Sequence, residues 1–407
     1  MRVLLVNRFY WPDRVGTGKI LTDLAIYLAQ GGADVSVVAS AAMIHASDWR
    51  LERQEDQDGV RIRRVLAGRF DRRKVLGWFL NAILFYPVSL WRILRLPRRD
   101  VTVFLTDPPL LFVLGPLVRW VKKTRFVCWS QDLYPDVAVE LGVLGRRSPL
   151  TAFWGWLAGW ALRRADLVIA IGETMKERLV AKGVKAERIA VVHNWADGEK
   201  VKPISAEVNP FLERYGLKDK FVVMYSGNFG LSHEFATVLE AAKRLTGQED
   251  IAFVFIGEGK QFETVRVQAA GLQALFLPFQ PEEELSNSLS AASVQVVTLK
   301  AGLEGILVPS KLYGAMAVAR PVIFVGPERS EVAQVIKEAM CGFTVMPGDA
   351  DGFMAAVLRL KAGTGERQAM GKRAHETIIA KYERRIGTAQ IGRLLAEVAL
   401  RPEAQGR

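Results

Sequence analysis

Residues 2–20, RVLLVNRFYWPDRVGTGKI, join a short apolar run to a glycine turn, and this order decides the fold. RVLLVN is an apolar run of the length and type of a buried strand. Ile20, Leu24 and Leu28 then recur at helical spacing until a Gly-Gly pair ends the helix. DVSVVAS follows as a second strand. The stretch therefore predicts the strand, glycine turn, helix and strand of a parallel α/β sheet.

The GTGK turn does not have the pattern of an ATP-hydrolysing P-loop. That pattern needs a glycine five residues before the Gly-Lys pair and a Ser or Thr after it, and Asp13 and Ile20 occupy these places. A dinucleotide fingerprint fails as well, because Leu21 stands where the third glycine would let the helix pack on the strand. The turn is thus suited to approach a ligand rather than to hydrolyse a nucleotide.

Length and composition indicate two globular domains. The chain has 407 residues, of which 50% are hydrophobic, enough for two cores. Cys128 and Cys341 are its two cysteines, far apart and without metal-ligand partners nearby, so neither a disulfide framework nor a zinc site is indicated. Arg8 and Asp13 closely follow the first apolar run, so we expect no signal peptide and a cytoplasmic protein.

The positive charge is concentrated in the first half of the chain. Residues 1–200 contain 31 Lys and Arg against 20 Asp and Glu, a net charge of +11, whereas the rest contain 24 and 23, a net charge of +1. An anionic membrane surface, an anionic substrate or nucleic acid would each explain this, as would a generally basic proteome. We expect no nucleic-acid binding, because no RNP-like or KH motif accompanies the basic residues.

Residues 69–99 are the candidate membrane-contacting segment. An uncharged run of 17 residues, 75–91, lies between basic clusters. A span needs about 20 mainly apolar residues, so a segment lying at the headgroup level fits better; buried helices of a large α/β core are the alternative. Aromatic rings and cations both favour the interface. The predicted acceptor and membrane residues are Arg72, Arg73, Lys74, Trp78 and Phe79.

Strand-like runs alternate with helical stretches in two separate parts of the chain. The alternation weakens after residue 200, where prolines and mixed charges mark a linker, and restarts with FVVMYSGNFG. We expect an α/β fold of two Rossmann-like, doubly wound parallel-sheet domains that face each other across a cleft. The predicted domains are 1–200, which binds the acceptor, and 201–380, which binds the donor. A C-terminal helix, 381–407, is expected to pack back on the first domain.

Residues 302–326, GLEGILVPSKLYGAMAVARPVIFVG, resemble the donor-binding region of glycosyltransferase family 4, a group of retaining GT-B enzymes. Further landmarks follow in the family's order, and the resemblance covers nearly the whole chain: they include GTG at 16–18, TDPP at 106–109, QDLYPD at 131–136, SGNFG at 226–230 and IGEGK at 256–260. The resemblance is greatest to bacterial enzymes of O-antigen, capsule and exopolysaccharide assembly, many of which carry a Pro-Ser-Lys-x-Tyr segment.

This resemblance implies a metal-independent, retaining transfer of a sugar from a nucleotide sugar, expected to be a UDP-sugar, to a lipid-linked glycan. No cofactor is implied beyond the nucleotide-sugar co-substrate. The enzyme would work at the inner face of the cytoplasmic membrane, with the membrane surface as a partner. Two alternatives remain open: a UDP-sugar epimerase, which can share the architecture, and a non-catalytic protein that binds sugar nucleotides.

The resemblance also suggests site residues, with two departures. Glu304 matches the first of two family glutamates, whereas Gly314 stands where the second would hold the ribose; His233 and Asn228 replace the usual diphosphate-binding cations. Lys311, at a helix start, becomes the candidate for donor phosphate. The predicted catalytic residues are Asp132, Glu304 and Lys311, with no metal ligands. The predicted donor-binding residues are Gly16, Thr17, Gly18, Gly227, Asn228, Gly257, Glu258, Gly305 and Ser310.

Overall fold

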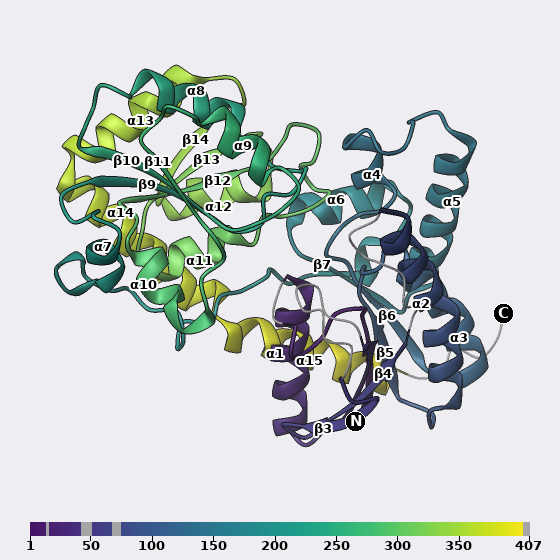
Figure 1. Ribbon diagram of the computed structural model, residues 1–407. Helices are drawn as coiled ribbons and strands as arrows, with labels where there is room; N and C mark the ends of the chain where they lie inside the picture. Colours follow the sequence, from purple (N-terminus) through teal and green to yellow (C-terminus); the bar gives the residue numbers. More distant parts are fainter. Residues whose placement is uncertain (14–15, 42–50, 67–74, 402–407) are drawn as a thin grey trace. The chain divides into compact units, whose positions relative to one another are not determined.

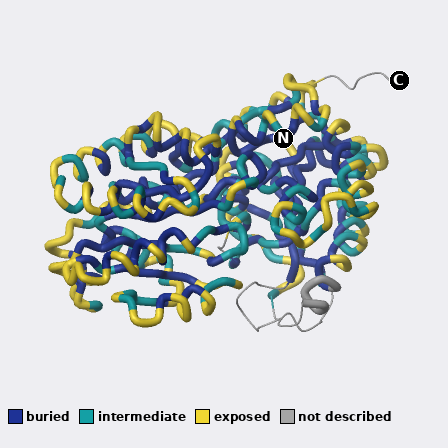
Figure 2. Tube along the Cα trace, turned by 90° about the horizontal axis from the view of Figure 1, so that it is seen from above, coloured by how far each residue is buried: buried dark blue, intermediate teal, exposed yellow. Residues whose placement is uncertain are grey.

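The computed structural model describes residues 1–13, 16–41, 51–66 and 75–401. The chain divides into two compact units (Figure 1): unit 1 comprises Met1–His193 with Arg385–Arg407, and unit 2 comprises Asn194–Arg384. In Figure 2, buried segments run through the interior of both units, and exposed segments lie at their surfaces. Each unit therefore has its own core.

Unit 1 is built on an eight-stranded sheet in the order β3-β4-β2-β1-β5-β6-β7-β8. All neighbours are parallel except β3, which pairs antiparallel with β4 at the edge. Most of its strands are short apolar runs that helices cover on both faces, which is why they read as continuous hydrophobic stretches. The strands are β1 (Arg2–Val6), β2 (Asp34–Ser40), β3 (Gln54–Gln57), β4 (Val60–Val65), β5 (Val101–Phe104), β6 (Arg125–Trp129), β7 (Leu167–Ala170) and β8 (Ile189–Val191).

The helices of unit 1 follow these strands in the alternation expected of a doubly wound fold. Among them α2, α3 and α5 form neighbouring contacts, α2 with α3 and α3 with α5. Pro149 starts α5 directly after Ser148, whose hydroxyl accepts from the N–H of Leu150. The helical segments are α1 (Thr17–Gln30), α2 (Val75–Arg95), η1 (Leu111–Leu114), α3 (Gly115–Lys122), α4 (Asp136–Glu140), α5 (Pro149–Arg164), α6 (Glu173–Ala181) and η2 (Ala186–Arg188).

The C-terminal helix α15 (Arg384–Leu400) belongs to the core of unit 1. Ile391 and Leu395 are fully buried on it. The amide of Gln390 donates to the carbonyl of Val191 at 3.2 Å, which attaches the helix beside β8. Unit 1 is thus completed by residues from the far end of the chain.

Unit 2 has a six-stranded parallel sheet in the order β11-β10-β9-β12-β13-β14. The strands are β9 (Phe221–Ser226), β10 (Ile251–Ile256), β11 (Ala274–Leu277), β12 (Val294–Thr298), β13 (Val322–Val325) and β14 (Gly342–Val345). The helical segments are η3 (Ala206–Val208), α7 (Pro210–Arg214), α8 (Ala236–Arg244), α9 (Phe262–Gln268), η4 (Glu282–Glu284), α10 (Leu285–Ser290), α11 (Lys311–Ala317), α12 (Glu331–Ala339), α13 (Ala350–Ala362), α14 (Thr364–Thr377) and η5 (Ile378–Tyr382). The sheet is therefore doubly wound, as in unit 1.

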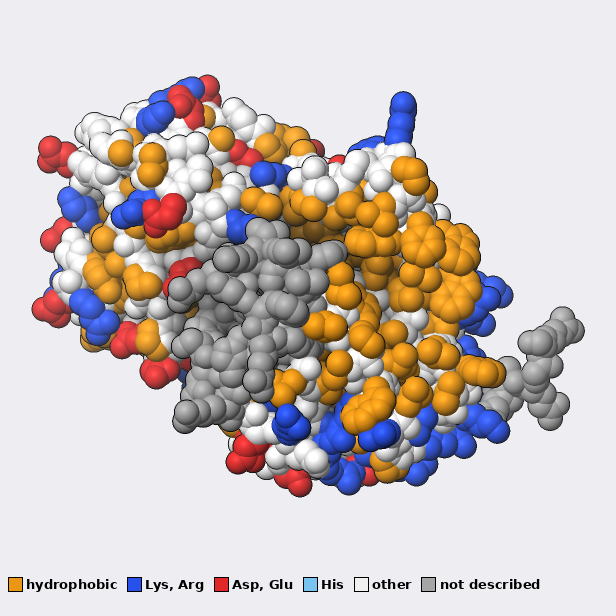
Figure 3. Space-filling model, turned by 45° about the vertical axis from the view of Figure 1, so that its right-hand side comes forward, with side chains coloured by type: hydrophobic (Ala, Val, Ile, Leu, Met, Phe, Trp, Pro, Cys, Tyr) orange, Lys and Arg blue, Asp and Glu red, His pale blue; other side chains and the backbone are white. Residues whose placement is uncertain are grey.

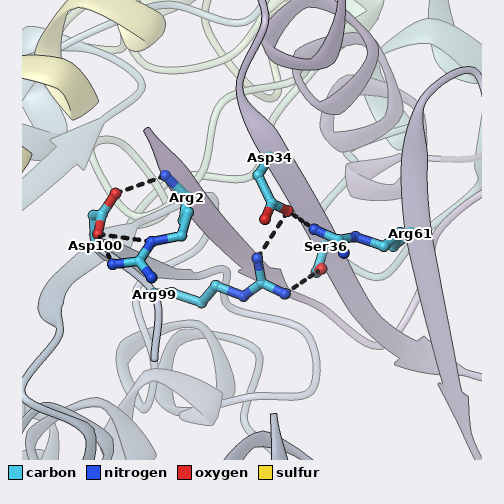
Figure 4. A network of polar contacts seen from close by, with 6 residues as sticks. All are labelled: Arg2, Asp34, Ser36, Arg61, Arg99 and Asp100. Atoms are coloured by element: carbon cyan, nitrogen blue, oxygen red, sulfur yellow. Dashed lines mark hydrogen bonds and ion pairs between the residues drawn. The ribbon is translucent and has the colours of Figure 1, made fainter. Parts of the chain in front are cut away.

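A polar network joins the strand starts of unit 1 (Figure 4). Arg99 donates to Asp34 at 2.8 Å and to the Ser36 hydroxyl at 3.0 Å, and Arg61 bonds the same carboxylate of Asp34. Arg2 bonds the Asp100 carboxylate through both its backbone N–H and its guanidinium. These contacts stabilise the sheet of unit 1 at the end where its strands begin.

Candidate functional site

The sheet of unit 2 has a topological switch point between β9 and β12. Chain order runs outward from β9 to β10 and β11 on one side, and from β12 to β14 on the other. In open α/β sheets, ligands bind outside the carboxyl ends of the strands at this point, because the connections that leave the two strands diverge there. The loops that begin after Ser226 and Thr298 therefore delimit the candidate site.

Two glycine turns pack directly against each other at this edge. Gly227 and Gly257, just after β9 and β10, have φ angles of 141° and 140°, which side chains rarely adopt. A Cβ on Gly257 would overlap the carbonyl oxygen of Gly227. The N–H of Phe229 donates to the carbonyl of Glu258 at 2.7 Å, which joins the turns. Both glycines are thus favoured by conformation, and Gly257 is also required by the close approach of the Gly227 backbone.

Lys311 extends across the first of these turns. A Cβ on Gly227 would lie 3.0 Å from Lys311 Cδ and would overlap its Cε. The Lys311 Nζ lies 5.3 Å from the centre of the Tyr225 ring, where the face of the ring attracts a cation. Burial lowers the pKa of Lys311 to about 7. Because Gly227 has no side chain, the Lys311 side chain can pass over this turn, and its ammonium group reaches the switch point.

His233 meets Lys311 at the same place. Its Nε2 lies 2.9 Å from the Lys311 Nζ, and its Nδ1 lies 2.8 Å from the backbone oxygen of Thr298. The imidazole is 5% exposed. Burial, together with the charge of Lys311, lowers the pKa of His233 to about 3, so the ring is neutral. The pair joins the loop after β9 to the end of β12.

The other predicted residues of unit 2 lie around this centre. Asn228 and Glu258 are exposed in the two glycine turns. Glu304 and Gly305 lie in the loop from β12 to α11, and Ser310 is exposed immediately before Lys311. The structure thus brings Gly227, Gly257 and Lys311 together.

Gly314, which replaces the expected ribose-binding glutamate, has room for a side chain. A Cβ there would meet Leu289 Cδ1 at 3.6 Å, an ordinary contact, and α11 has no left-handed residue at this position. Packing therefore does not force a glycine at position 314, and recognition of a ribose would have to use other groups.

The predicted GTG turn lies in unit 1, at the start of α1. Gly16 has a φ of 57°, and a Cβ on Gly18 would come within 2.6 Å of the Asp13 carbonyl oxygen. The Thr17 hydroxyl accepts from the Asn7 amide at 3.3 Å. The lack of a side chain at Gly18 thus lets the start of α1 approach Asp13, and both glycines lie in a different unit from Lys311.

Asp132 stands at the end of β6, beside the end of β5. The Thr106 hydroxyl accepts from the backbone N–H of Asp132 at 3.3 Å. Burial raises the pKa of Asp132 to about 6. Burial also raises the pKa of Asp107 to about 7, against the charge of Arg8 and together with that of Asp132. Asp107 therefore lies at the switch point between β1 and β5 and Asp132 lies beyond the neighbouring strand β6, and burial raises the pKa of both carboxyl groups.

Sequence reasoning missed Asp107 and the contact partners of Lys311. Asp107 follows β5 as Asp132 follows β6, so a search for acidic residues directly after the predicted strands would have found it. The sequence showed only that His233 stands where the family has a cation. Its bond to Lys311 joins residues 78 positions apart and has no local signal.

Three neighbouring helices of unit 1 carry an exposed apolar surface, which we call the aromatic face. It comprises Ile83, Leu84 and Trp91 of α2, Leu117, Trp120 and Val121 of α3, and Leu150, Phe153 and Trp156 of α5. Figure 3 shows hydrophobic side chains gathered over this part of unit 1, with Lys and Arg at the rim. None of the three helices contains Asp or Glu, and all end in basic residues: Arg92, Arg95, Arg119, Lys122, Arg163 and Arg164.

The predicted membrane residues are only partly covered by the structure. Arg72, Arg73 and Lys74 lie outside the described residues; Trp78 and Phe79 belong to α2, but their side chains lie outside the described part. Within the remainder of α2, Phe85 is fully buried and Trp91 is 53% exposed. One face of the helix therefore belongs to the core and another lies at the surface, and the contact of this segment with a membrane stays a prediction.

None of the helices in the described ranges is both long and apolar enough to cross a bilayer. Among the same residues, no three His, Cys, Asp or Glu side chains are grouped as metal ligands would be.

Both units match known protein families. Residues 15–195 match the glycosyl transferase 4-like domain, and residues 211–377 match glycosyl transferases group 1. The chain is 31% identical over 258 residues to the probable glycosyltransferase WbjE of Pseudomonas aeruginosa, a match that spans 63% of this chain and 64% of that protein. It is 26% identical over 414 residues to the putative colanic acid biosynthesis glycosyl transferase WcaI of Escherichia coli, spanning 95% and 96% of the two chains.

Solved structures share the fold over nearly the whole chain. Anabaena HepE, solved in complex with UDP, superposes with a TM-score of 0.75 at 15% identity, covering 98% of this chain and 100% of its own. Sucrose-phosphate synthase from Thermosynechococcus elongatus gives a TM-score of 0.77 at 18% identity, covering 98% and 99%. At 15% and 18% sequence identity, this likeness shows only that the fold is shared.

Proposed function

Because this chain belongs to the family 4 type of glycosyltransferases, with a glycosyl transferase 4-like domain followed by a group 1 domain, we propose that it transfers a sugar from a UDP-sugar to a lipid-linked glycan. The predicted family and the predicted GT-B fold class, two parallel-sheet α/β domains, are confirmed. The proposed reaction proceeds with retention and belongs to bacterial polysaccharide assembly. The name of the relative WcaI assigns that protein to colanic acid biosynthesis.

The observation that carries the donor assignment is the position of Lys311. Its ammonium group lies at the switch point of unit 2, over a turn whose glycine leaves space for it. A departing nucleoside diphosphate gains negative charge in the transition state, and a fixed cation in a partly buried site stabilises that charge. HepE, which shares the fold, was solved with UDP and with UDP-glucose, and this favours uridine as the base.

We assign the remaining candidates by this chemistry. Lys311 contacts the diphosphate, the turns at Gly227 and Gly257 approach the nucleotide with their backbone, and Glu304 serves the donor sugar. No metal or cofactor is included in this proposal, because Lys311 supplies the positive charge at the leaving group. Asp132, with Asp107 beside it, binds a sugar hydroxyl in unit 1.

The aromatic face supports a lipid-linked acceptor. Exposed Trp and Phe rings with cations and no acidic residues complement an anionic membrane surface, where the apolar rings enter the interface and each nearby cation adds about 1 kcal/mol. A polyprenyl-diphosphate acceptor is presented at such a surface. We therefore place the enzyme on the inner face of the cytoplasmic membrane, where nucleotide sugars are available.

A transfer assay tests the function directly. Purified protein is incubated with radiolabelled UDP-, GDP- and ADP-sugars and with polyprenyl-diphosphate glycans in vesicles, and the lipid product is identified by mass and by the NMR coupling of its anomeric proton. We expect a product from a UDP-sugar with the donor's anomeric configuration, and its loss in Lys311→Met. An altered sugar nucleotide without a lipid product would favour the epimerase, and nucleotide binding without turnover would favour the non-catalytic alternative.

Vesicle binding tests the acceptor side separately. Trp120→Ser and Phe153→Ser remove side chains of the aromatic face that are 78% and 53% exposed, so we expect weaker cosedimentation with phosphatidylglycerol vesicles. Val208→Ser and Val267→Ser, at 73% and 69% exposure in unit 2, are matched controls. Equal loss in all four variants, or in none, would contradict the assignment of this surface.

A further inference from the structure

We propose that His233 is the positioning residue of the donor site: its neutral imidazole, protonated on Nδ1, holds the Lys311 ammonium group at the switch point, ready for the donor diphosphate. This inference rests on the proposed function and deepens it. His233 stands where the family resemblance implies a diphosphate-binding cation, so at this place the chain has a neutral acceptor and the positive charge comes from Lys311.

The hydrogen bonds of His233 determine its tautomer. The backbone oxygen of Thr298, 2.8 Å from Nδ1, only accepts hydrogen bonds, so Nδ1 carries the proton. In a neutral imidazole Nε2 is then an acceptor, and the Lys311 Nζ at 2.9 Å donates to it. An ammonium group has three N–H donors, so this bond leaves two for a phosphate.

The loop that carries His233 is fixed on both sides. The Gln261 side chain donates to the carbonyls of Gly230 at 2.5 Å and of His233 at 3.2 Å. The backbone N–H of Lys300, beyond β12, donates to the carbonyl of Ser232 at 2.9 Å. The imidazole is therefore held to both strands of the switch point before any ligand binds, as a positioning group requires.

Tyr225 and His233 fix the position of the Lys311 ammonium group without neutralising its charge. The Tyr225 ring lies on one side at 5.3 Å, and the His233 ring, itself at 5.8 Å from the Tyr225 ring, provides the acceptor. Neither partner carries a negative charge. The ammonium group is thus oriented by a hydrogen bond and a ring face, and its charge is left to be matched by the donor phosphates.

Two substitutions of His233 separate the roles of its nitrogens. Asn places its amide near the position of Nδ1 and keeps a donor for Thr298, whereas Gln reaches the position of Nε2 and offers Lys311 an acceptor. We expect UDP affinity, measured by calorimetry, to fall roughly tenfold or more in His233→Asn, the size of a lost hydrogen bond to a charged group. His233→Gln should retain most of the affinity. Equal affinities of the two variants would overturn the proposal.

A double-mutant cycle shows whether His233 acts through Lys311. In a Lys311→Met background, His233→Asn should change UDP affinity by less than about twofold, because the group it positions is already gone. Additive losses would overturn the proposal and indicate a merely structural histidine. His375→Asn is the matched control: His375 also bonds a backbone oxygen, that of Ala317, at 2.8 Å in unit 2, and its replacement should leave UDP affinity unchanged.

The tautomer provides a readout that needs no nucleotide. Long-range ¹H–¹⁵N spectra of the histidine rings, with His233 assigned from the spectrum of His233→Gln, should show a proton on Nδ1 and a bare Nε2 whose shift changes in Lys311→Met. An Nε2–H tautomer would overturn the proposal. Wild-type protein that binds none of UDP, GDP or ADP would overturn the proposed function together with this role, whereas UDP binding that His233→Asn leaves intact would overturn this role alone.

Discussion

The backbones of Gly227 and Gly257 approach each other so closely that a Cβ on Gly257 would overlap the carbonyl oxygen of Gly227. The N–H of Gly227 donates to the carbonyl oxygen of Ile256 at 2.8 Å. Neither turn can therefore move away from the other without breaking this hydrogen bond. The path of Lys311 crosses the same turn. The proposed donor site therefore depends on two positions that have no side chain.

Gly257→Ala should destabilise unit 2 and weaken UDP binding. The φ of 140° alone costs an alanine about 1–3 kcal/mol, and the overlap with Gly227 displaces the turn in addition. Thermal unfolding and calorimetry measure the two effects. Gly247→Ala, which has nothing within 4 Å of its Cβ, is the control; a Gly257 variant that behaves like it would contradict the described turn.

UDP affinity should fall as the pH rises above about 7. Burial lowers the pKa of Lys311 to about 7 in the free protein, and a bound phosphate favours the charged amine. Binding above this pH therefore takes up a proton, and the affinity decreases by up to tenfold per pH unit.

Calorimetry in buffers of different ionisation enthalpy would measure that proton uptake. Lys311→Met should bind weakly and without this dependence. An affinity of the wild type that is constant from pH 7 to 9 would rule out Lys311 as the phosphate contact.

Asp107→Asn should stabilise the protein at pH 8 more than at pH 5. The pKa of Asp107 is raised from 3.8 to about 7 in the folded state, so the folded protein binds more protons between these values and loses stability as the pH rises through them. The asparagine removes the buried charge that exists at pH 8. Unfolding temperatures at both pH values provide the measurement, with the exposed Asp56→Asn as control; equal shifts at pH 5 and pH 8 would refute the prediction.

Leu395→Ala should destabilise unit 1 by about 2–5 kcal/mol, the usual cost of a cavity at a fully buried leucine. Leu400→Ala, the same change at an 84% exposed position of the same helix, should have almost no effect. Denaturant unfolding compares the two. Similar effects would mean that α15 does not pack in unit 1 as described.

The sequence allowed the fold to be predicted because its strands are short apolar runs set between glycine turns and helical stretches. β1 and β9 are buried on both faces, so hydrophobicity alone marks them. The edge strand β3, with the sequence QEDQ, is polar, and its antiparallel pairing with β4 could not be read from any pattern.

The candidate site was only partly predictable. Lys311 and the glycine turns are local features, since a helix start and a strand end each have a signature in the chain. The partners of Lys311 are not local, because they depend on which strands are neighbours. The order that places β12 beside β9 brings Thr298 to His233, and hydrophobic periodicity does not specify strand order.

The amino-acid sequence by itself therefore determined the fold class, the family and the positions of the glycine turns. Tertiary structure decided the neutral partner of Lys311, the electrostatic interaction of Asp107 with Asp132 and the extent of the aromatic face. The physical reason is the same in each case. Secondary structure and burial follow from nearby residues, whereas proximity between residues such as Lys311 and His233, 78 positions apart, is created by the packing of the strands.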